Sequence, residues 1–470
     1  MSEERLFNEI ISSFKFQVTD DQKELFSVFS QFCYTNAYKP VMIINGYAGT
    51  GKTSALAAIS DALDKLKIPS VLMASTGRAA KVLSSFCGKN AYTIHKKIYR
   101  QRSFKDGSGR FVLNANLGDR KVFIVDEASM ISIKVQESNI FGSGNLLEDL
   151  VDFVFSNNNC RLVLTGDIAQ LPPVNESHSP ALNPMVLESL GCTVFNISLS
   201  QITRQALDSG ILVNATMVRT AIEHNISSDI RLSSQKFADI VRVERAEIEY
   251  AIESSYNEYG SDETVIICRS NKQANKYNQF IRNRILYREE ALSSTDKLLV
   301  VKNNYFWLPE NEDTDFIANG DFLTLRKIKK TQDMYGFRFA DCILELNDYK
   351  IEFEAKLLLD TLDSDGPGIT KAQSEQLYNA VSADYAHIPN KRKRYEKMLE
   401  DPYFNALQTK MGYAMTCHKA QGGQWKSVFV DFSFFGNDSK EIEVQRWLYT
   451  AVTRATEKLY LVNFDDKYFV

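Results

Sequence analysis

A glycine-rich stretch that ends in a lysine and a threonine is the strongest chemical signal in the sequence. Residues 46–53 read GYAGTGKT and fit the spacing GxxxxGK[ST]. Glycines let backbone N–H groups approach phosphate oxygens closely, and a helix that starts here directs its positive end at them. In this pattern the lysine reaches the β and γ phosphates and the threonine hydroxyl ligates Mg²⁺. The stretch therefore predicts a phosphate cradle made of Gly46, Ala48, Gly49, Thr50, Gly51, Lys52 and Thr53.

Two adjacent acids follow the apolar run KVFIV. Asp126 and Glu127 come at the carboxyl end of this predicted strand, which is the edge where open α/β sheets bind ligands. We expect Asp126 to hold Mg²⁺, directly or through water, and Glu127 to orient and deprotonate the attacking water. The guanine-recognition pattern Asn-Lys-x-Asp is not matched by NKQA at 271–274, so ATP is favoured over GTP.

The elements that position these groups follow a repeated order. Short apolar segments that begin at residues 41, 70, 121 and 161 alternate with helical stretches, and a second set begins at 264, 411, 426 and 458. Such alternation predicts parallel sheets with helices on both faces. Between about 327 and 405 the pattern changes to antiparallel strands and then to helix with a basic centre, which indicates an insertion in the second α/β unit.

Composition sets broad limits. The chain has 470 residues, a net charge of −4 and seven scattered cysteines without CxxC spacing. These features argue against a disulfide framework and a zinc site, favour a reducing, cytoplasmic location, and leave nucleic-acid binding to local patches. The acidic N-terminus predicts no signal or transit peptide, and no run approaches the ~20 apolar residues of a membrane span.

Five segments resemble the ordered motifs of superfamily-one helicases. They are GYAGTGKT, DEASM (126–130), LTGDIAQLPPV (164–174), MTCHKAQGGQW (415–425) and WLYTAVTRATEKLYLV (447–462). They are most similar to the RecD/Dda branch, whose members move 5′ to 3′ on single-stranded DNA. The resemblance implies an α/β fold with two RecA-like P-loop NTPase domains and ATP in the cleft between them. It also implies a hairpin insertion in the first domain and a small β-barrel and helical insertion in the second.

The resemblance assigns the remaining nucleotide contacts. Arg454 in AVTRA and Arg204 in LSQITRQ match arginines of the family that act as fingers on the γ-phosphate, where positive charge is needed. Gln170 matches a residue that senses the γ-phosphate and links it to DNA. VTDDQKELF resembles the family's Q motif, which places Gln22 against adenine. Relatives often carry glutamate near the ribose; this chain departs from that pattern, and Gln424 is the residue expected there.

A track for a nucleic-acid strand is expected at the ends of other strands. ASTGRAAKVL (74–83) and TIH (93–95) resemble motifs Ia and Ib of the family. Threonine hydroxyls near helix starts bind phosphates without reading sequence, although they equally serve as helix caps. Histidine and arginine can add charge or stacking. The predicted strand contacts are Thr76, Arg78, Thr93, His95, Thr416 and His418.

Three further stretches bear on duplex separation. RSFKDGSGRFVL (102–113) has aromatic flanks around KDGSG and predicts a hairpin where relatives place a separating pin, with a plain surface loop as the alternative. IANGD (317–321) resembles the entry to the small barrel of this branch. The basic run NKRKR (390–394) is either a DNA contact or simply a solvated surface.

The sequence thus predicts an ATP- and Mg²⁺-dependent DNA helicase that acts, by resemblance, 5′ to 3′. We expect a monomer that acts on single-stranded DNA and duplex junctions, with replication or repair proteins as partners and no membrane attachment. The expected organisation is a helical segment with the Q motif (1–39), a first RecA-like domain (40–198, hairpin about 100–118) and a second (199–470). A single-strand translocase that removes proteins, and an RNA-acting helicase, share these motifs and remain alternatives.

Overall fold

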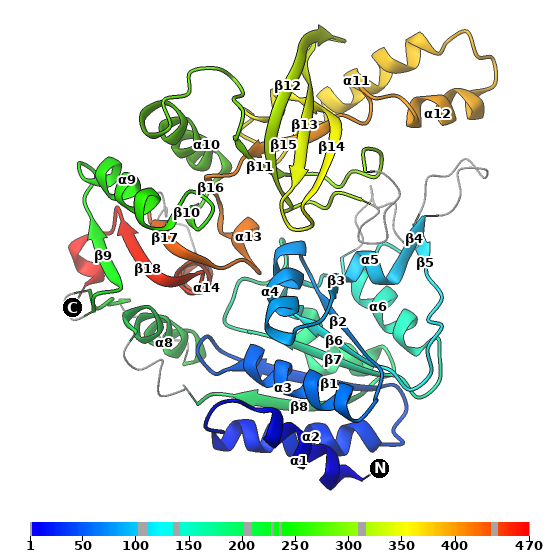
Figure 1. Cartoon of the computed structure of the whole chain (residues 1–470), viewed down its shortest axis with the longest axis vertical. Helices are drawn as coiled ribbons and strands as arrows, with labels where there is room; N and C mark the ends of the chain where they lie inside the picture. The colour runs from blue at the N-terminus through cyan, green and yellow to red at the C-terminus, as the bar shows by residue number, and fades with distance from the viewer. Residues whose placement is uncertain are drawn as a thin grey trace.

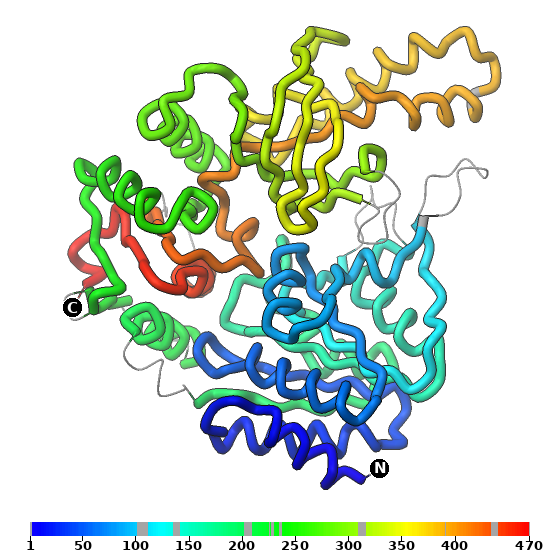
Figure 2. Tube along the Cα trace, viewed as in Figure 1, coloured from blue at the N-terminus to red at the C-terminus, as the bar shows by residue number. Residues whose placement is uncertain are grey.

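The computed structural model describes residues 2–101, 111–134, 142–201, 209–224, 226, 230–234, 237–308, 316–433 and 440–469. Within them the chain forms two α/β lobes and a β-barrel (Figure 1). The first lobe carries the N-terminal helices, the second contains the C-terminal strand, and the barrel with its helical arm stands at the opposite end of the molecule from the N-terminus (Figure 2). This arrangement confirms the predicted fold class.

The first lobe is a parallel sheet with helices packed against it. Six of the described strands pair in the order β3-β2-β6-β7-β1-β8. The strands are β1 (Pro40–Gly46), β2 (Ser70–Ala74), β3 (Ala91–Thr93), β6 (Val122–Asp126), β7 (Arg161–Gly166) and β8 (Thr193–Leu199). The helices are α1 (Glu3–Ser13), α2 (Asp20–Tyr34), α3 (Lys52–Lys65), α4 (Gly77–Cys87), α5 (Ile94–Ile98), α6 (Leu146–Phe155) and α7 (Pro184–Ser189), with 3₁₀ turns η2 (Ala128–Met130) and η3 (Pro180–Leu182).

The strand order of this lobe explains why its chemical residues meet. The three neighbours β6, β7 and β1 are parallel, so their carboxyl ends lie at one edge of the sheet. All seven residues of β1 are buried, as its continuous apolar run requires for a central strand covered on both faces. The acid pair after β6, the TGD segment after β7 and the glycine-rich loop after β1 therefore lie side by side.

The second lobe is a smaller parallel sheet. Five of the described strands pair in the order β16-β10-β17-β18-β9. The strands are β9 (Ile240–Val243), β10 (Thr264–Cys268), β16 (Ala414–Thr416), β17 (Trp425–Asp431) and β18 (Ala455–Val462). The helices are α8 (Gly210–Glu223), α9 (Ile248–Tyr259), α10 (Asn271–Phe280), α13 (Cys417–Ala420) and α14 (Glu441–Val452), with the π-helical turn η5 (Ile281–Ile285) and the 3₁₀ turn η7 (Asp466–Tyr468).

The inserted barrel is larger than the sequence indicated. The closed barrel consists of β11 (Lys297–Val300), β12 (Phe322–Met334), β13 (Phe337–Leu346), β14 (Ile351–Leu358) and β15 (Leu407–Met411). It therefore extends beyond the predicted insertion of 327–405 on both sides. The barrel closes because β11 pairs with both β12 and β15. The sequence did not reveal this, because a short apolar run such as β11 has the same pattern as a core strand of an α/β sheet.

A helical arm projects from the barrel. It contains η6 (Leu359–Thr361), α11 (Lys371–Asp384) and α12 (Lys391–Leu399), and α12 includes most of the basic run noted in the sequence. Apolar residues of the arm, among them Leu377, Val381 and Met398, pack against Phe337 and Phe339 of the barrel. In Figure 1 the arm stands away from both lobes.

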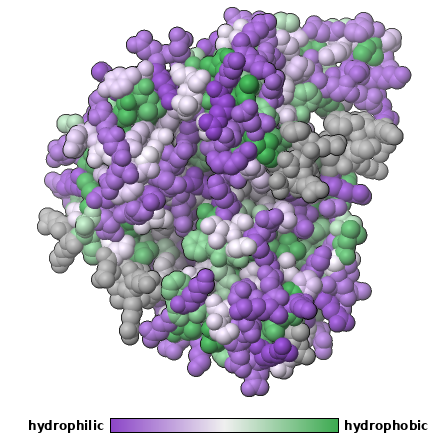
Figure 3. Space-filling model, viewed as in Figure 1, coloured by the Kyte–Doolittle hydropathy of each residue, from purple (hydrophilic) through white to green (hydrophobic). Residues whose placement is uncertain are grey.

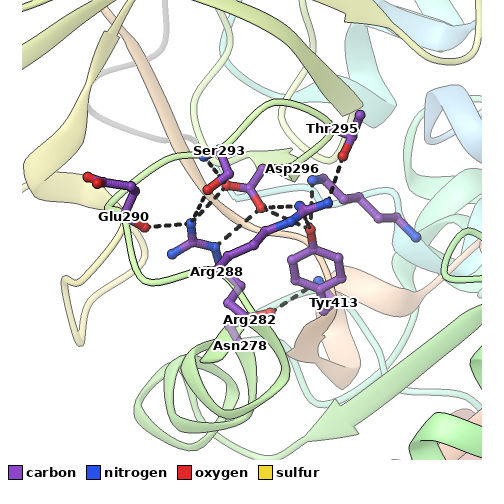
Figure 4. Close-up of polar contacts among 9 residues, drawn as sticks. Asn278, Arg282, Arg288, Glu290, Ser293, Thr295, Asp296 and Tyr413 are labelled. Atoms are coloured by element: carbon purple, nitrogen blue, oxygen red, sulfur yellow. Dashed lines mark hydrogen bonds and ion pairs between the residues drawn. The ribbon is translucent and has the colours of Figure 1, made fainter. Parts of the chain in front are cut away.

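One buried carboxylate fastens the barrel to the second lobe (Figure 4). Asp296, fully buried just before β11, accepts hydrogen bonds from Arg282 (3.2 and 3.1 Å) and Arg288 (2.6 Å). The hydroxyl of Tyr413 (3.1 Å) and the backbone N–H of Ser293 (2.7 Å) complete its shell. Because these groups come from η5, from the loop before the barrel and from the segment before β16, the network joins the barrel and the lobe at several points.

Loss of this carboxylate is expected to destabilise the protein strongly. Asp296→Ala would leave two guanidinium groups without their buried partner, which costs about 3–5 kcal/mol of unfolding free energy. Glu400→Ala is the matched control, because its pair with Lys397 is exposed on both sides (57% and 61% of the side chains) and such pairs contribute about 0–1 kcal/mol. Urea unfolding of both variants measures the difference; equal losses would contradict the assigned role.

Figure 3 shows a mainly hydrophilic face with small separate apolar patches. Among the described residues no helix combines the length and apolar character needed to cross a bilayer.

Candidate nucleotide site and strand track

The loop between β1 and α3 has the geometry of an anion cradle. Gly49 and Gly51 have φ values of +78° and +79°, which only glycine adopts readily. A Cβ added to Gly46 would lie 2.6 Å from the Cγ of Lys52, so glycine is required there by close packing. The loop leads directly into α3 at Lys52, and a helix N-terminus that follows such a loop offers free N–H groups to phosphate.

Lys52 folds back onto its own loop. Its Nζ donates to the backbone carbonyl oxygens of Gly46 and Tyr47, the latter at 3.0 Å. An ammonium group satisfied by two carbonyl groups is held at the mouth of the cradle. It can exchange these neutral acceptors for charged phosphate oxygens, which form stronger hydrogen bonds.

The acid pair lies at the end of β6 as predicted. Burial and the neighbouring Glu127 charge together raise the pKa of Asp126 to about 7, against the lowering effects of the Glu127 N–H and the Lys52 charge. Glu127 adopts left-handed backbone angles (φ +52°), and its Oε2 is buried without a hydrogen-bond partner among the described residues. Backbone strain and an unsatisfied carboxylate oxygen are features typical of functional positions.

These observations fit a divalent cation. A buried carboxylate whose ionisation is disfavoured by burial is stabilised by a cation placed beside it. Asp126 and Thr53 line the same cavity, and both offer oxygen ligands of the kind that Mg²⁺ prefers.

The segment after β7 contributes a further acid that the sequence did not assign. Asp167 is buried, and burial raises its pKa while Lys52 and Tyr449 lower it. The TGD triplet after an apolar strand was the available signal. Gln170, three residues later, is also buried, and its Oε1 lacks a hydrogen-bond partner among the described residues. Both side chains line the cavity with the cradle.

Arg454 faces this cavity from the other lobe. It follows α14, is 3% exposed, and donates to the carbonyl oxygens of Thr450 (3.0 Å) and Gly423 (3.3 Å) and to the hydroxyl of Thr453 (3.1 Å). Its guanidinium is therefore held firmly within the second lobe at the wall of the cleft. Arg204, the other predicted arginine, lies outside the described residues.

The cavity has a volume of about 1150 Å³ and lies at the seam between the lobes. Its lining includes Lys52, Thr53, Asp126 and Glu127 from the first lobe and Ser209, Gln424 and Arg454 from the second lobe or the segments beside it. Phe14, Phe16 and Val18 line the part near α2 and offer apolar surface suited to a planar base.

The two predicted base and ribose contacts differ in how much of their amide is free. Gln22 is 1% exposed; its Oε1 accepts from Thr19 N–H (3.1 Å) in a capping box, and its Nε2 donates to the carbonyl of Thr50 (3.1 Å). One N–H and one lone pair remain for adenine. Gln424 lines the cavity with an exposed side chain, and its backbone carbonyl accepts from Arg78.

The predicted strand threonines lie at helix starts. Thr76 caps α4 and Thr93 caps α5 by accepting from N–H groups three residues ahead, at 3.2 Å in both cases. Thr416 precedes α13 but makes no side-chain cap hydrogen bond. A Cβ on Gly422 would lie 2.8 Å from the Thr76 hydroxyl, so the α4 start of the first lobe meets the motif loop of the second.

Two of the predicted basic strand contacts, Arg78 and His95, do not offer the free positive charge that the sequence suggested. The guanidinium of Arg78 stacks over Trp425 at 4.0 Å and donates to the Gln424 carbonyl, which joins the two lobes. Burial lowers the pKa of His95 to about 4, so this imidazole is neutral at physiological pH and adds no charge. His418 is exposed. The His95 ring contacts that of Tyr99, with centroids 5.7 Å apart, so His418 is the histidine whose exposed ring suits stacking on a base.

The barrel touches the start of α4. A Cβ on Gly77 would lie 2.8 Å from Oδ1 of Asp321 and 3.5 Å from Oδ2 of Asp348, and Lys81 pairs with Asp348 at 3.5 Å. Burial, with a smaller contribution from the charge of Asp348, raises the pKa of Asp321 to about 7. Two carboxylates of the barrel therefore approach a helix N-terminus where a nucleic-acid phosphate was expected.

The base of the predicted hairpin is a two-stranded ribbon. β4 (Tyr99–Gln101) and β5 (Phe111–Leu113) pair antiparallel, with Tyr99 opposite Leu113. Residues 102–110, the predicted tip, lie outside the described residues. Phe111 packs against Tyr305 of the loop after β11, with ring centroids 4.5 Å apart. The ribbon thus connects the first lobe with the barrel side.

Comparisons with known proteins agree with this geometry. Residues 19–220 match the family model for an AAA domain, and residues 411–462 match the UvrD-like helicase C-terminal domain. The two segments contain the cradle and Arg454. Two parallel-sheet lobes with the cradle and acids on one side and an arginine on the other define a two-lobed P-loop nucleotide-binding protein. An AAA domain followed by a UvrD-like helicase C-terminal domain, together with similarity to RecD2 and Pif1-type helicases, supports a superfamily-one helicase of the Pif1/RecD-like kind.

Individual relatives cover different parts of the chain. The chain is 23% identical over 514 residues to uncharacterized protein R530 of Acanthamoeba polyphaga mimivirus, covering 91% of this chain and 96% of that protein. It is 28% identical over 173 residues to the ATP-dependent RecD2 DNA helicase of Deinococcus radiodurans, covering 37% of this chain and 21% of that protein. The match thus spans about a fifth of that helicase. The crystal structure of a Bacteroides Pif1 helicase in complex with ADP-AlF3 and ssDNA aligns over 97% of this chain and 95% of that chain, with 12% identity and a TM-score of 0.47.

Proposed function

We propose that this protein is an ATP-dependent DNA helicase that moves 5′ to 3′ along single-stranded DNA and separates the duplex ahead of it. One observation carries the proposal. Lys52, Asp126 and Glu127 of the first lobe and Arg454 of the second line a single cavity at the seam. Hydrolysis in such a site requires both lobes, and therefore it can be coupled to their relative movement.

The residues divide the chemistry of ATP hydrolysis between them. The β and γ phosphates are held by Lys52 and by the N–H groups of the glycine-rich loop other than that of Ala48, which donates to the Tyr449 hydroxyl. Glu127 accepts a proton from the attacking water, whose oxygen bonds to the γ-phosphorus while the bond to the bridging oxygen of ADP breaks. Arg454 stabilises the charge on the transferring group from the opposite side. Mg²⁺, held by Thr53 and Asp126, would neutralise phosphate charge.

The remaining predicted contacts complete the proposal. Gln22 hydrogen-bonds adenine with the free part of its amide, Gln424 approaches the ribose, and Gln170 with its unsatisfied oxygen responds to the γ-phosphate. Arg204 serves as a second arginine finger. We retain the domain division at residues 39 and 198 as part of this proposal.

The protein moves along DNA because the two lobes bind and release the strand alternately. Thr76 and Thr93 hold strand phosphates on the first lobe and Thr416 on the second, with His418 stacking on bases and Arg78 available once the seam opens. ATP binding closes the lobes and shortens the distance between these contacts; hydrolysis releases them. The barrel carboxylates at the start of α4 must withdraw before a strand can enter.

Strand displacement on tailed duplexes tests the proposal. With ATP and Mg²⁺, we expect a duplex with a 5′ single-stranded tail to be unwound at least ~10-fold faster than one with a 3′ tail, and no unwinding with a non-hydrolysable ATP analogue. Equal rates, or a preference for the 3′ tail, would contradict the polarity. ATP hydrolysis without strand displacement would instead support a single-strand translocase.

Two further experiments distinguish a helicase from a protein-removing translocase and from an RNA-acting enzyme. Replacing residues 102–110 by a glycine-serine linker of equal length should abolish unwinding but leave DNA-stimulated hydrolysis, if the hairpin is the wedge. A translocase that removes bound proteins would retain its activity in this variant. Stimulation of hydrolysis by RNA equal to that by DNA would favour an RNA-acting enzyme.

A further inference from the structure

A tyrosine of the second lobe places its hydroxyl between the glycine-rich loop and the TGD segment of the first lobe. Tyr449 lies on α14 and is 1% exposed. Its hydroxyl oxygen accepts a hydrogen bond from the backbone N–H of Ala48, 2.9 Å away in the glycine-rich loop. The same hydroxyl donates to Oδ2 of Asp167 at 2.6 Å. One side chain therefore joins the cradle, the TGD segment and the opposite lobe.

The directions of these hydrogen bonds are fixed by chemistry. A backbone N–H can only donate, so the hydroxyl oxygen must accept from Ala48 and use its own proton toward Asp167. Burial raises the pKa of Tyr449 well above its usual value, which keeps the proton on the hydroxyl. The other oxygen of Asp167 accepts from the N–H of Ala169 at 2.9 Å. Each group in this buried chain thus has a partner.

The tyrosine is also tied to the arginine of the cleft. Arg454 lies five positions after Tyr449 in the sequence. The backbone carbonyl of Tyr449 accepts from the hydroxyl of Thr453 (2.8 Å), and that hydroxyl accepts from Nη2 of Arg454 (3.1 Å). The Arg454 Nε donates to the carbonyl of Thr450, the next residue of the helix. The end of α14 and the guanidinium therefore move as one unit.

We propose that Tyr449 is a positioning residue for ATP hydrolysis. Its hydroxyl fixes the distance between the glycine-rich loop and the end of α14, and so it places the Arg454 guanidinium opposite Lys52. This inference rests on the proposed function, because it assumes phosphoryl transfer in this cavity. Placement of this kind affects the transition state more than ground-state binding, since small displacements of a catalytic group can cost roughly 10²-fold in rate.

Two other hydrogen bonds join the lobes at Leu171, and they allow the positioning role of Tyr449 to be distinguished from simple docking of the lobes. The hydroxyl of Thr450 accepts from Leu171 N–H at 2.8 Å, and Gln421 Nε2 donates to the carbonyl of the same Leu171 at 2.6 Å. These contacts hold the lobes together but do not reach the glycine-rich loop. A variant that removes the Thr450 hydroxyl weakens docking and leaves the link to Ala48 intact.

Tyr449→Phe tests the inference, because it removes one oxygen atom and retains the ring. With saturating single-stranded DNA, we expect kcat for ATP hydrolysis to fall ~10- to 100-fold while KM for ATP changes less than ~3-fold. Binding of ADP with aluminium fluoride should weaken by a similar factor, and binding of a non-hydrolysable ATP analogue should not. Thr450→Val should reduce kcat less than ~3-fold, and so should Tyr460→Phe, a matched tyrosine change in β18.

Three results would overturn the inference: a kcat for Tyr449→Phe within ~3-fold of wild type, an equal loss in Thr450→Val, or a loss of kcat with a parallel rise in KM and a fall in Tm. Failure of the proposed function has a different outcome, because the wild-type protein itself would then hydrolyse no ATP.

Discussion

Glu127→Gln is expected to bind ATP with near-normal affinity and to lose roughly 10²–10⁴-fold in turnover. Glutamine has the size of glutamate but cannot accept a proton from water. In the structure the Glu127 carboxylate lies in the cavity with Lys52, and one of its oxygens has no hydrogen-bond partner among the described residues, so it is available for that water. Its loss should therefore affect the chemical step and leave the phosphate cradle intact.

Single-turnover hydrolysis and fluorescent-nucleotide binding together measure this effect. Glu249→Gln, an exposed change on α9, is the control and should retain full activity. The variant should trap DNA-bound, ATP-bound protein if hydrolysis is what releases the strand. A turnover within ~3-fold of wild type would exclude Glu127 as the base and direct attention to Asp126 or Asp167 instead.

Arg454→Ala is expected to reduce kcat by roughly 10³–10⁵-fold, as is typical when an arginine finger is removed. KM for ATP should change less than ~5-fold, since the contact forms mainly in the transition state. Arg454→Lys should rescue little, because lysine lacks the planar fork that now spans three acceptors in the second lobe.

The buried position of this arginine requires a check on folding. Arg454 is 3% exposed, so its loss leaves acceptors such as the Gly423 carbonyl without a partner and can lower Tm. Thermal unfolding of the variant, with Arg326→Ala on the exposed side of the barrel as control, separates that effect from catalysis. Equal reductions in ATP affinity and turnover would show that Arg454 binds the ground state and is no finger.

Several features of the site follow directly from adjacent residues. The glycine-rich loop was predictable because its function depends on backbone angles at Gly49 and Gly51 and on the helix that starts at Lys52, all within eight residues. The acid pair was predictable because a carboxyl-terminal strand end is the binding edge of a parallel sheet. Thr76 and Thr93 were expected near helix starts, and their capping geometry follows from the local chain.

Other features depend on segments that are distant in the sequence. Ala48 and Tyr449 are 401 positions apart, and no local pattern distinguishes this tyrosine from a core residue. Arg78 was expected on the strand track, yet it stacks on Trp425 because the two lobes meet there. The barrel's outer limits were missed because β11 closes on β15, which lies more than 100 residues later.

The sequence by itself indicated which residues contact phosphate and which strand ends carry them. It also indicated the order of the superfamily-one motifs. Each of these depends on residue types at short, fixed spacing. The tertiary structure alone decided that Tyr449 joins the cradle to the opposite lobe and that Asp296 fastens the barrel. It also places Arg454, which the resemblance had assigned to the γ-phosphate, in the lining of the cavity that contains Lys52. These are contacts between surfaces brought together by folding. Their hydrogen bonds depend on how two lobes pack, and packing is a property of the whole chain.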